Sequence, residues 1–556
     1  MNILVGGENF DELRESGCYY VDKTDMLYEL GQNTNNKVTL FTRPRRFGKT
    51  LTMRMIESFF DISRDSRSVF EGLDIMKHEE FCEKWMNQYP VLFITLKDAE
   101  SLKFETAYAK LKNSIADLCK KHDYLGTSEK VNPFDKETFM RLQGNRASDY
   151  EVQNSLLLLC RMMSSHYGKP VILLIDEYDV PLAKANEEKE AGVRYYGEML
   201  DVIRGIMSTA LKSNDYLKFA VVTGCLRIAK ESIFTGVNNF ASCSVLDKEF
   251  SQTFGFTQTE VDALLQAADR EDMAAVFKSW YDGYIFGNES VYCPWDVINY
   301  VAAILRDKDA RPKNYWANTS SNGIIRDFAG NRDFDVSEKF ETLMNGGTIT
   351  QAVSDDLTYD TIHETEDNLW SILLMTGYLT KAYPEEGGDT VTLRIPNKEI
   401  YAVFETAVVR LFRESLDKDR QRALMDAFWS GDAGKASALL SEFLFDTISF
   451  HDYHEDYYHA FLTGIFVGLG CGVKSNHEQG LGRTDITLTD KKNRRALVIE
   501  AKKSDSEQHM EADCTDALKQ IEEKRYADGL KGYKQIKCFG ISFFQKSALV
   551  KSRRAS

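Results

Sequence analysis

Four short runs of apolar and β-branched residues mark the first half of the chain. They occupy positions 38–42, 91–96, 171–175 and 217–223. Nearly every position in each run is apolar, which is typical of strands that are buried on both faces. Helix-length segments separate the runs, and positions 51–60 repeat apolar residues at helical spacing. The pattern predicts a parallel sheet in an α/β domain.

The pattern changes after residue 250. Helical spacing and aromatic clusters at 280–284 and 294–297 predict a helical subdomain that packs on the sheet domain. A helical connector follows, and the rest of the chain predicts a second α/β domain with the order helix, two strands, helix, strand. The predicted segments are 1–250 (sheet domain), 251–400 (helical subdomain), 401–450 (connector) and 451–556 (second α/β domain).

Composition places the chain among ordinary globular proteins. Apolar residues make up 43% and charged residues 28% of the 556 residues, which excludes disordered and fibrous classes. The ten cysteines form no Cys-x-x-Cys pair, so neither a disulfide framework nor a zinc site is expected. The longest uncharged apolar stretch, 462–473, is shorter than the roughly 20 residues of a membrane helix. Positions 1–5 lack a signal-peptide pattern, so we expect a cytoplasmic protein without a membrane partner.

Charge is unevenly distributed along the chain. The formal net charge of −16 argues against a protein that coats polyanions in general. Two basic islands nevertheless stand out: positions 37–54 hold six basic residues and no acidic one, and positions 474–503 hold eight basic residues against four acidic ones. A basic run is usually a solvated surface. Because both islands coincide with chemical motifs, we expect them to meet phosphate groups instead.

The first island carries most of a nucleotide-binding motif. The pattern G-x-x-x-x-G-K-[ST] ends here in Gly48, Lys49 and Thr50, between a predicted strand and a predicted helix. Glycine lets backbone N–H groups approach phosphates, lysine reaches the β and γ phosphates, and threonine holds Mg²⁺, all at a helix N-terminus that favours anions. Arg43 replaces the first glycine of the pattern, and Arg46 is a further candidate for nucleotide contact.

Two later strand ends add residues of the same chemistry. The third apolar run ends in Asp176 and Glu177, the arrangement of an acid that binds Mg²⁺ followed by a carboxylate that orients the attacking water. Thr223 ends the fourth run, where it could contact that water or the γ-phosphate, or only bond the backbone. Arg227 could sense phosphate in its own or a neighbouring subunit, or lie on the surface. Together these motifs predict a nucleotide and Mg²⁺ site.

The second island surrounds a pair of carboxylates. Asp485 and, fifteen positions on, Glu500 fall on predicted neighbouring strands, and strand alternation places Lys502 on the same face as Glu500. Two carboxylates can hold Mg²⁺ while the lysine orients or activates a nucleophile, which suits phosphodiester hydrolysis. The alternative is a hairpin with surface salt bridges. Supporting candidates are Glu478, as an additional ligand, with Gln520 and Tyr526 on the following helix.

Four segments resemble one bacterial family. Residues 19–24, 42–50, 174–179 and 223–230 are similar to the AAA-ATPase-like family, whose members typically carry a restriction-endonuclease-like domain at the C-terminus. The order of the C-terminal elements and the D…E-x-K placement resemble the PD-(D/E)XK nuclease fold. The resemblance implies a P-loop domain that uses ATP, a variant loop at Arg43, and a nuclease that acts on nucleic acid, with DNA favoured over RNA.

Two classes of function remain open at this point. One is an ATP-coupled, Mg²⁺-dependent nuclease, and the other is a nucleotide-driven signalling switch whose C-terminal domain binds nucleic acid or a partner without cleaving. The joint presence of Lys49, Asp176, Asp485, Glu500 and Lys502 favours the enzyme. The sequence leaves the oligomeric state open, although the resemblance is compatible with a ring or dimer in which a neighbour's arginine completes the ATP site.

Overall fold

The computed structural model divides into two compact units, each described here by itself. The first comprises residues 1–318 and 350–399, and the second comprises 319–349 and 400–556. The structure describes residues 1–33, 36–186, 195–228, 233–234, 237, 239–316, 336–359, 361–362, 364–384, 390–415, 418–447, 458, 461–463, 465–466, 472–479, 482–530 and 532–554. Among these residues, no helix is both long enough and apolar enough to cross a membrane.

A parallel five-stranded sheet forms the centre of the first unit. Its strands are β1 (Val38–Thr42), β2 (Val91–Thr95), β3 (Val171–Asp176), β4 (Leu217–Gly224) and β5 (Phe240–Cys243), in the order β2-β3-β4-β1-β5. The α/β fold with a parallel sheet is therefore confirmed, while β5 was not predicted. Because β4 lies between β1 and β3, the strand before residues 43–50, here called the phosphate loop, does not pair with β3, the strand that ends in Asp176.

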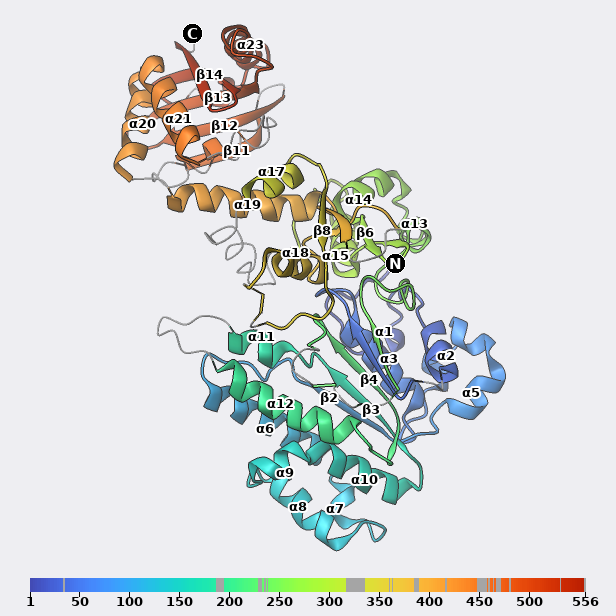
Figure 1. Cartoon of the computed structure of the whole chain (residues 1–556). Coiled ribbons are helices and arrows are strands. Elements are labelled where there is room, and N and C mark those ends of the chain that lie inside the picture. The colour runs from blue at the N-terminus through green and yellow to red at the C-terminus, as the bar shows by residue number, and fades with distance from the viewer. Residues whose placement is uncertain are drawn as a thin grey trace. The chain divides into compact units, whose positions relative to one another are not determined.

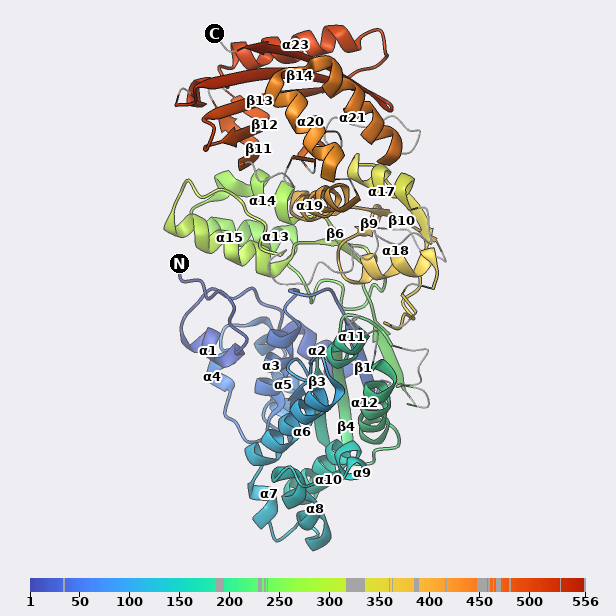
Figure 2. The same cartoon turned by 90° about the vertical axis from the view of Figure 1, so that its left-hand side faces the viewer.

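Helices cover both faces of this sheet (Figure 2). The side chain of Phe93 on β2 contacts Arg54 of the helix on one face, whereas the next residue, Ile94, lies with Leu111 and Ile203 of helices on the other. This alternation is the period of two expected for a strand. The helices are α3 (Lys49–Phe60) on the first face, and α6 (Phe104–Lys121), α10 (Ser155–Tyr167) and α12 (Tyr196–Leu211) on the second.

Shorter helices surround this core. They are α1 (Phe10–Glu15), α2 (Asp25–Gln32), α4 (Arg67–Phe70), α5 (Glu79–Trp85), α7 (Tyr124–Thr127), α8 (Pro133–Gln143), α9 (Asp149–Gln153) and α11 (Val180–Asn186). The segment predicted as a helical subdomain contains α13 (Gln258–Ala267), α14 (Ala274–Tyr281), α15 (Pro294–Arg306) and α18 (Glu366–Met375), together with small sheets of β6 (Tyr284–Phe286), β7 (Glu289–Val291), β8 (Ile349–Ala352), β9 (Thr380–Lys381) and β10 (Thr390–Arg394). Phe277, Tyr281 and Tyr300 belong to the apolar cluster between α13, α14 and α15.

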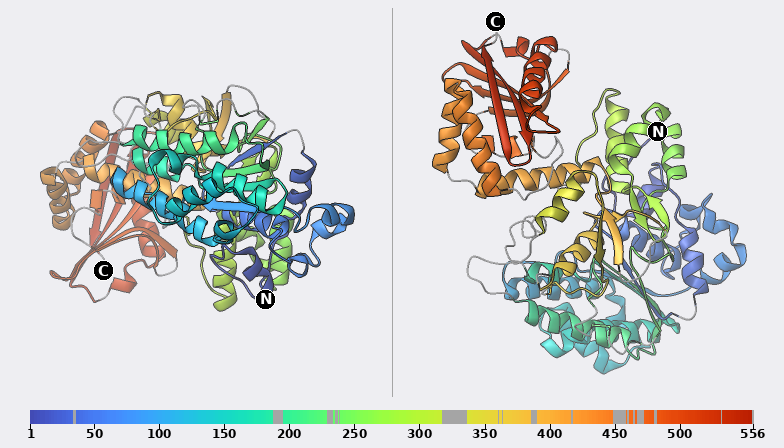
Figure 3. Two further views of the ribbon diagram at one scale, coloured as in Figure 1. Left: turned by 90° about the horizontal axis from the view of Figure 1, so that it is seen from below. Right: turned by 45° about the horizontal axis from the view of Figure 1, so that its top comes forward.

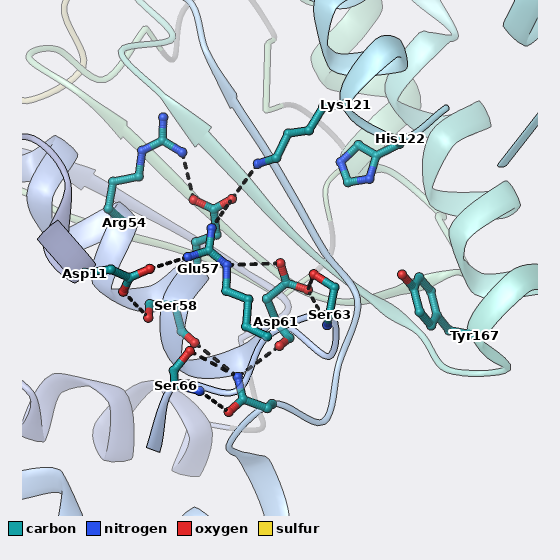
Figure 4. Close-up of polar contacts among 12 residues, drawn as sticks. Asp11, Arg54, Glu57, Ser58, Asp61, Ser63, Ser66, Lys121, His122 and Tyr167 are labelled. Carbon is teal, nitrogen blue, oxygen red and sulfur yellow. Dashed lines mark hydrogen bonds and ion pairs between the residues drawn. The ribbon is translucent and has the colours of Figure 1, made fainter. Parts of the chain in front are cut away.

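A buried carboxylate fixes α3 to its surroundings. Glu57 is 1% exposed, and its oxygens lie 2.8 Å from Arg54 and 2.8 Å from Lys121, which converge on it in Figure 4. Arg64 also contacts Glu57, at 3.4 Å, and is paired with Asp11. Burial raises the pKa of Glu57, but the charges of Lys121 and Arg54 outweigh this and lower it overall. Ion pairs of Glu57 therefore hold the C-terminal end of α3, the helix that begins at the phosphate loop.

The second unit contains a five-stranded mixed sheet. Its strands are β11 (Gly472–Gln479), β12 (Gly482–Asp490), β13 (Arg495–Lys503), β14 (Gln535–Phe544) and β15 (Ser547–Arg554), in sequence order. β13 and β14 are parallel and are connected through α23 (Met510–Glu523), whereas the other neighbours are antiparallel. Where the sequence predicts two strands the structure has three, β11, β12 and β13, while the predicted second helix and last strand are present as α23 and β14. β15 adds an edge strand that was not predicted, and the first predicted helix of this domain lies largely outside the described residues.

Helices pack on both faces of the second sheet (Figures 1 and 3). A Cβ at Gly540 would lie 2.2 Å from the carbonyl oxygen of Cys514, so α23 lies directly against β14 there. The preceding residue, Phe539, faces the other way and contacts Phe428, with 4.9 Å between ring centroids. The helices on that side, α20 (Lys418–Ser430) and α21 (Ala433–Thr447), come from the segment predicted as a connector. The remaining helices of this unit are α17 (Ser337–Met344) and most of α19 (Lys398–Ser415).

Candidate nucleotide and nuclease sites

The loop between β1 and α3 has the backbone of an anion site. Gly48 caps α3 with φ +81°, a left-handed conformation that side chains rarely adopt. Arg46 also has a positive φ, at 75°. The twelve-residue helix that follows presents its first N–H groups and the positive end of its dipole to the space in front of the loop. The sequence folds this way because glycine allows the turn immediately before the helix.

Lys49 lies folded against this loop. Its Nζ donates to the carbonyl oxygens of Arg43 and Pro44, both at 2.9 Å, and lies 3.9 Å from the sulfur of Cys225. The side chain is 6% exposed. Neutral carbonyl partners do not cancel the charge of an ammonium group, so Lys49 keeps that charge available for an anionic ligand.

Three predicted residues converge at the sheet edge beside the loop. The hydroxyl of Thr50 donates to Asp176 Oδ2 at 2.8 Å, and the hydroxyl of Thr223 donates to Asp176 Oδ1 at 2.5 Å. Asp176 is completely buried. A threonine hydroxyl and a carboxylate are the hard oxygen donors that Mg²⁺ prefers, so Thr50 and Asp176 fit this ion.

Glu177 adopts a strained backbone next to this cluster. Its φ is +54°, which for a residue other than glycine costs of the order of 1–3 kcal/mol and is found mainly at functional sites. The N–H of Glu177 donates to Thr223 Oγ1 at 3.3 Å. Burial raises the pKa of its carboxyl, although the charge of Lys49 opposes the rise. A raised pKa suits a group that accepts a proton from water.

Arg43, at the position of the missing glycine, has a role that the motif did not reveal. Its guanidinium is fully buried and donates to the carbonyl oxygens of Thr42 (2.9 Å), Cys243 (2.7 Å) and Phe250 (3.3 Å). It also lies 5.3 Å from the ring centroid of Phe286. Burial lowers the pKa of Arg43 to about 10. The side chain thus joins the ends of β1 and β5 beneath the loop.

Two arginines predicted to contact nucleotide are held by protein groups. The guanidinium of Arg46 lies 3.9 Å from the ring centroid of Trp295. Arg227 is paired with Asp355 at 3.5 Å and with Asp356 at 3.2 Å. Both assignments stay predictions, and each arginine would exchange these partners for phosphate.

Asp179 organises the chain that follows Thr223, a role that sequence reasoning missed. Its Oδ2 accepts hydrogen bonds from the N–H groups of Cys225 (2.9 Å) and Leu226 (3.1 Å), and from the hydroxyl of Tyr359 (2.9 Å). The sequence could have indicated this role by position, because Asp179 closely follows the Asp176-Glu177 pair at a strand end.

The second candidate site lies where β12 and β13 pair. Ile486 is opposite Ile499, which places Asp485 opposite Glu500. The N–H of Ala501 donates to Asp485 Oδ2 at 2.8 Å, and the N–H of Asp485 lies 3.5 Å from Glu500 Oε2. These bonds orient two carboxylates on adjacent strands, as the sequence spacing predicts, and the pair supplies the oxygen donors that Mg²⁺ requires.

The helix behind this pair contributes further groups. The side-chain amide of Gln520 on α23 donates to Glu500 Oε1. Tyr526 is 2% exposed, and burial, with the charges of Glu500 and Asp485, raises the pKa of its hydroxyl, whereas Gln520 and Lys502 oppose the rise. Gln520, Glu500, Asp485 and Lys502 therefore all lie close enough to affect the Tyr526 hydroxyl.

Glu478 is the remaining candidate at this site. Its backbone belongs to β11 and pairs with Arg483 of β12, but its side chain lies outside the described part of the structure. Among the described residues, no group of three or more His, Cys, Asp and Glu side chains has the geometry of a metal site. The Mg²⁺ ligands predicted here are instead pairs, completed by a hydroxyl in the first unit.

Comparisons with known proteins assign both domains to families. Residues 4–234 match the family described as "Predicted AAA-ATPase", and residues 453–553 match the PD-(D/E)XK nuclease superfamily. A protein of Azotobacter chroococcum mcd 1, described as an uncharacterized protein in the vnfD 5′ region, is 26% identical over 98% of this chain and 97% of its own length. The resemblance seen in the sequence is confirmed: the chain joins an AAA-ATPase-like domain to a C-terminal domain of the PD-(D/E)XK nuclease superfamily.

Proposed function

We propose that the protein hydrolyses ATP and couples this reaction to Mg²⁺-dependent cleavage of phosphodiester bonds in nucleic acid, with DNA as the favoured substrate. The supporting observation is that each domain brings its candidate acidic residues into contact with the groups predicted to act with them. Asp176 is bonded to Thr50 and Thr223 in the first unit, and Asp485 and Glu500 are linked across paired strands in the second.

In the ATPase domain, each side chain has a distinct task. Lys49 and the N–H groups at the start of α3 bind the phosphates, and Glu177 accepts a proton from the attacking water. Thr50 and Asp176 would hold Mg²⁺. Thr223 keeps Asp176 in place and bonds the N–H of Glu177, so it fixes the acid and the base relative to each other.

In the nuclease domain, Asp485 and Glu500 would hold Mg²⁺, and Lys502 orients or activates the water that attacks phosphorus. Bound Mg²⁺ supplies Lewis-acid stabilisation of phosphate charge and acidifies water. Gln520 fixes the Glu500 carboxylate by its hydrogen bond. The basic residues of 474–503 supply attraction for a phosphate backbone.

The deciding experiment measures cleavage of plasmid DNA with Mg²⁺ or Mn²⁺, with and without ATP, alongside ATP turnover. Asp485→Ala and Lys502→Ala should abolish cleavage and leave ATP turnover intact. Lys503→Ala, on the opposite face of β13, changes the same charge and should retain cleavage. Lys49→Ala should lose ATP binding and alter the ATP dependence of cleavage.

Other outcomes would reject parts of this proposal. Normal ATP turnover without cleavage under any metal would favour the signalling switch. Cleavage by Asp485→Ala would show that the nuclease centre lies elsewhere, and ATP binding by Lys49→Ala at wild-type affinity would refute the nucleotide site. The oligomeric state, a ring or a dimer, is a separate prediction that sedimentation in the presence of ATP would test.

A further inference from the structure

The outer side of the phosphate loop packs against the 281–316 and 350–399 parts of the same unit. The ring of Phe47 lies edge-on to Tyr284, with 5.1 Å between centroids, and 4.9 Å from Phe286. A Cβ at Gly377 would lie 2.9 Å from Pro44, and Gly377 has φ +85°. Because these groups are close-packed, a change in the loop must be accommodated by the segment that covers it.

The side chain of Arg46 contacts Trp295 in this covering segment, and a bound nucleotide could break that contact. Its guanidinium lies 3.9 Å from the ring centroid of Trp295, in the first turn of α15. Its carbonyl oxygen lies 3.7 Å from the sulfur of Cys293. The backbone of Arg46 is therefore fixed to the start of α15, while its charged end rests on the face of a half-buried aromatic ring.

The residue after Trp295 belongs to a buried pair of carboxyl groups. Asp296 and Glu399 are both fully buried, and Glu399 Oε1 accepts the N–H groups of Tyr315 (2.5 Å) and Trp316 (2.9 Å). Burial raises the pKa of both carboxyls, and the charge of Asp296 raises that of Glu399 further. The positive charge of Arg46 lowers the pKa of Asp296, against the effect of burial.

Both acids belong to the first unit, and Glu399 is the last residue of that unit along the chain. Glu399 is in the first turn of α19, and the boundary between the units falls immediately after it, at Ile400. The helix continues across that boundary into the unit that contains the nuclease domain. A change in how Glu399 is held would thus act on the start of the helix that leads to the second site.

We propose that Arg46 is a nucleotide-responsive positioning residue, which leaves Trp295 for the phosphates of a bound nucleotide and so changes the anchoring of α19 by the Asp296–Glu399 pair. The inference rests on the proposed nucleotide site and specifies how it regulates the nuclease site. Charge-assisted bonds to phosphate are stronger than a cation–π contact at a partly exposed ring, so the ligand wins the competition. By linkage, whatever releases Arg46 from Trp295 favours nucleotide binding.

The first test follows Trp295 directly. Nucleotide binding is measured by calorimetry with Mg²⁺ and a non-hydrolysable ATP analogue, and tryptophan fluorescence is recorded in the same titration. We expect a fluorescence change in the wild type that disappears in Trp295→Phe. If the analogue binds and the change is absent or persists in Trp295→Phe, the inference fails while the nucleotide site stands. If the analogue does not bind, both fail.

The sign of an affinity change separates competition from simple disruption. Trp295→Leu removes the ring that holds Arg46, so the analogue should bind about 2- to 10-fold more tightly than to the wild type, as expected for the loss of a cation–π contact. A purely structural role for Trp295 predicts weaker binding. Unchanged or weaker binding by correctly folded Trp295→Leu would therefore overturn the inference.

The second test concerns transmission to the nuclease. Asp296→Asn and Glu399→Gln keep the size of each side chain but replace its carboxyl group by an amide. Both should retain nucleotide-free cleavage and lose the ATP response, bringing the ratio of cleavage with and without ATP to about one. Asp282→Asn is the matched control, since this acid in the same segment bonds Ser290 at 3.2 Å, and it should keep the wild-type ratio. A wild-type ratio in both amide variants refutes the transmission step.

Discussion

Replacing Thr223 by valine removes one hydroxyl from the centre of the proposed ATPase site and changes little else. That hydroxyl donates to Asp176 Oδ1 at 2.5 Å and accepts the N–H of Glu177 at 3.3 Å. Thr223 is 1% exposed, so bulk water cannot restore either bond. Valine has a similar shape, and the backbone pairing of β4 would remain.

The expected magnitude follows from these two bonds. A hydrogen bond to a charged carboxylate contributes about 1.5–3 kcal/mol and an ordinary one about 1 kcal/mol, so the free energy of unfolding should fall by about 2–4 kcal/mol. If the carboxylate bond also serves the transition state, turnover should fall about 10- to 150-fold. Nucleotide affinity should change less, because Lys49 and the start of α3 are untouched.

Thr42→Val provides a closely matched control. Thr42 ends the neighbouring strand β1 and is 2% exposed, and its hydroxyl has no hydrogen-bond partner among the described residues. The same substitution there should leave the free energy of unfolding, measured by urea denaturation, within about 0.5 kcal/mol of wild type. ATP turnover and calorimetric affinity complete the comparison. Equal stability and equal turnover for the two variants would refute the role given to Thr223.

Three further predictions concern buried charge. Glu57→Ala should lower the free energy of unfolding by about 2–4 kcal/mol, whereas Lys121→Ala, whose side chain is 48% exposed, should cost less than about 1 kcal/mol; equal urea-denaturation losses would contradict this. Arg43→Met leaves three carbonyl oxygens without their donor and should cost about 3 kcal/mol in the same assay, and a wild-type value would disprove its anchoring role. Because burial raises the folded-state pKa of Glu399 above 4.5, the native state binds more protons than the unfolded chain and wild-type stability falls as pH rises from there. Glu399→Gln cannot titrate, so its stability relative to wild type should increase between about pH 5 and pH 8, and a constant difference would exclude the effect.

The sequence by itself determined most of the local elements and pointed to the candidate residues beside them. The strands β1 to β4 were predictable because strands buried on both faces are apolar at almost every position. Gly48 and Lys49 of the phosphate loop were recognised by their spacing within a short motif. Glu500 and Lys502 were recognised in the same way, because they lie two residues apart on one strand. β5 escaped notice because its four residues are mostly half-buried and show no such continuous run.

Only the tertiary structure decided which distant residues meet. Thr223 reaches Asp176 because β4 inserts beside β3, and the order of strands in a sheet leaves no periodic trace in the sequence. In the sequence, Arg43 is only a departure from the first glycine of the nucleotide-binding motif. The structure shows that its guanidinium joins β1 to β5. Asp296 and Glu399 come together across about a hundred residues, and burial is the main cause that raises their pKa values, which the hydropathy of their neighbours does not encode.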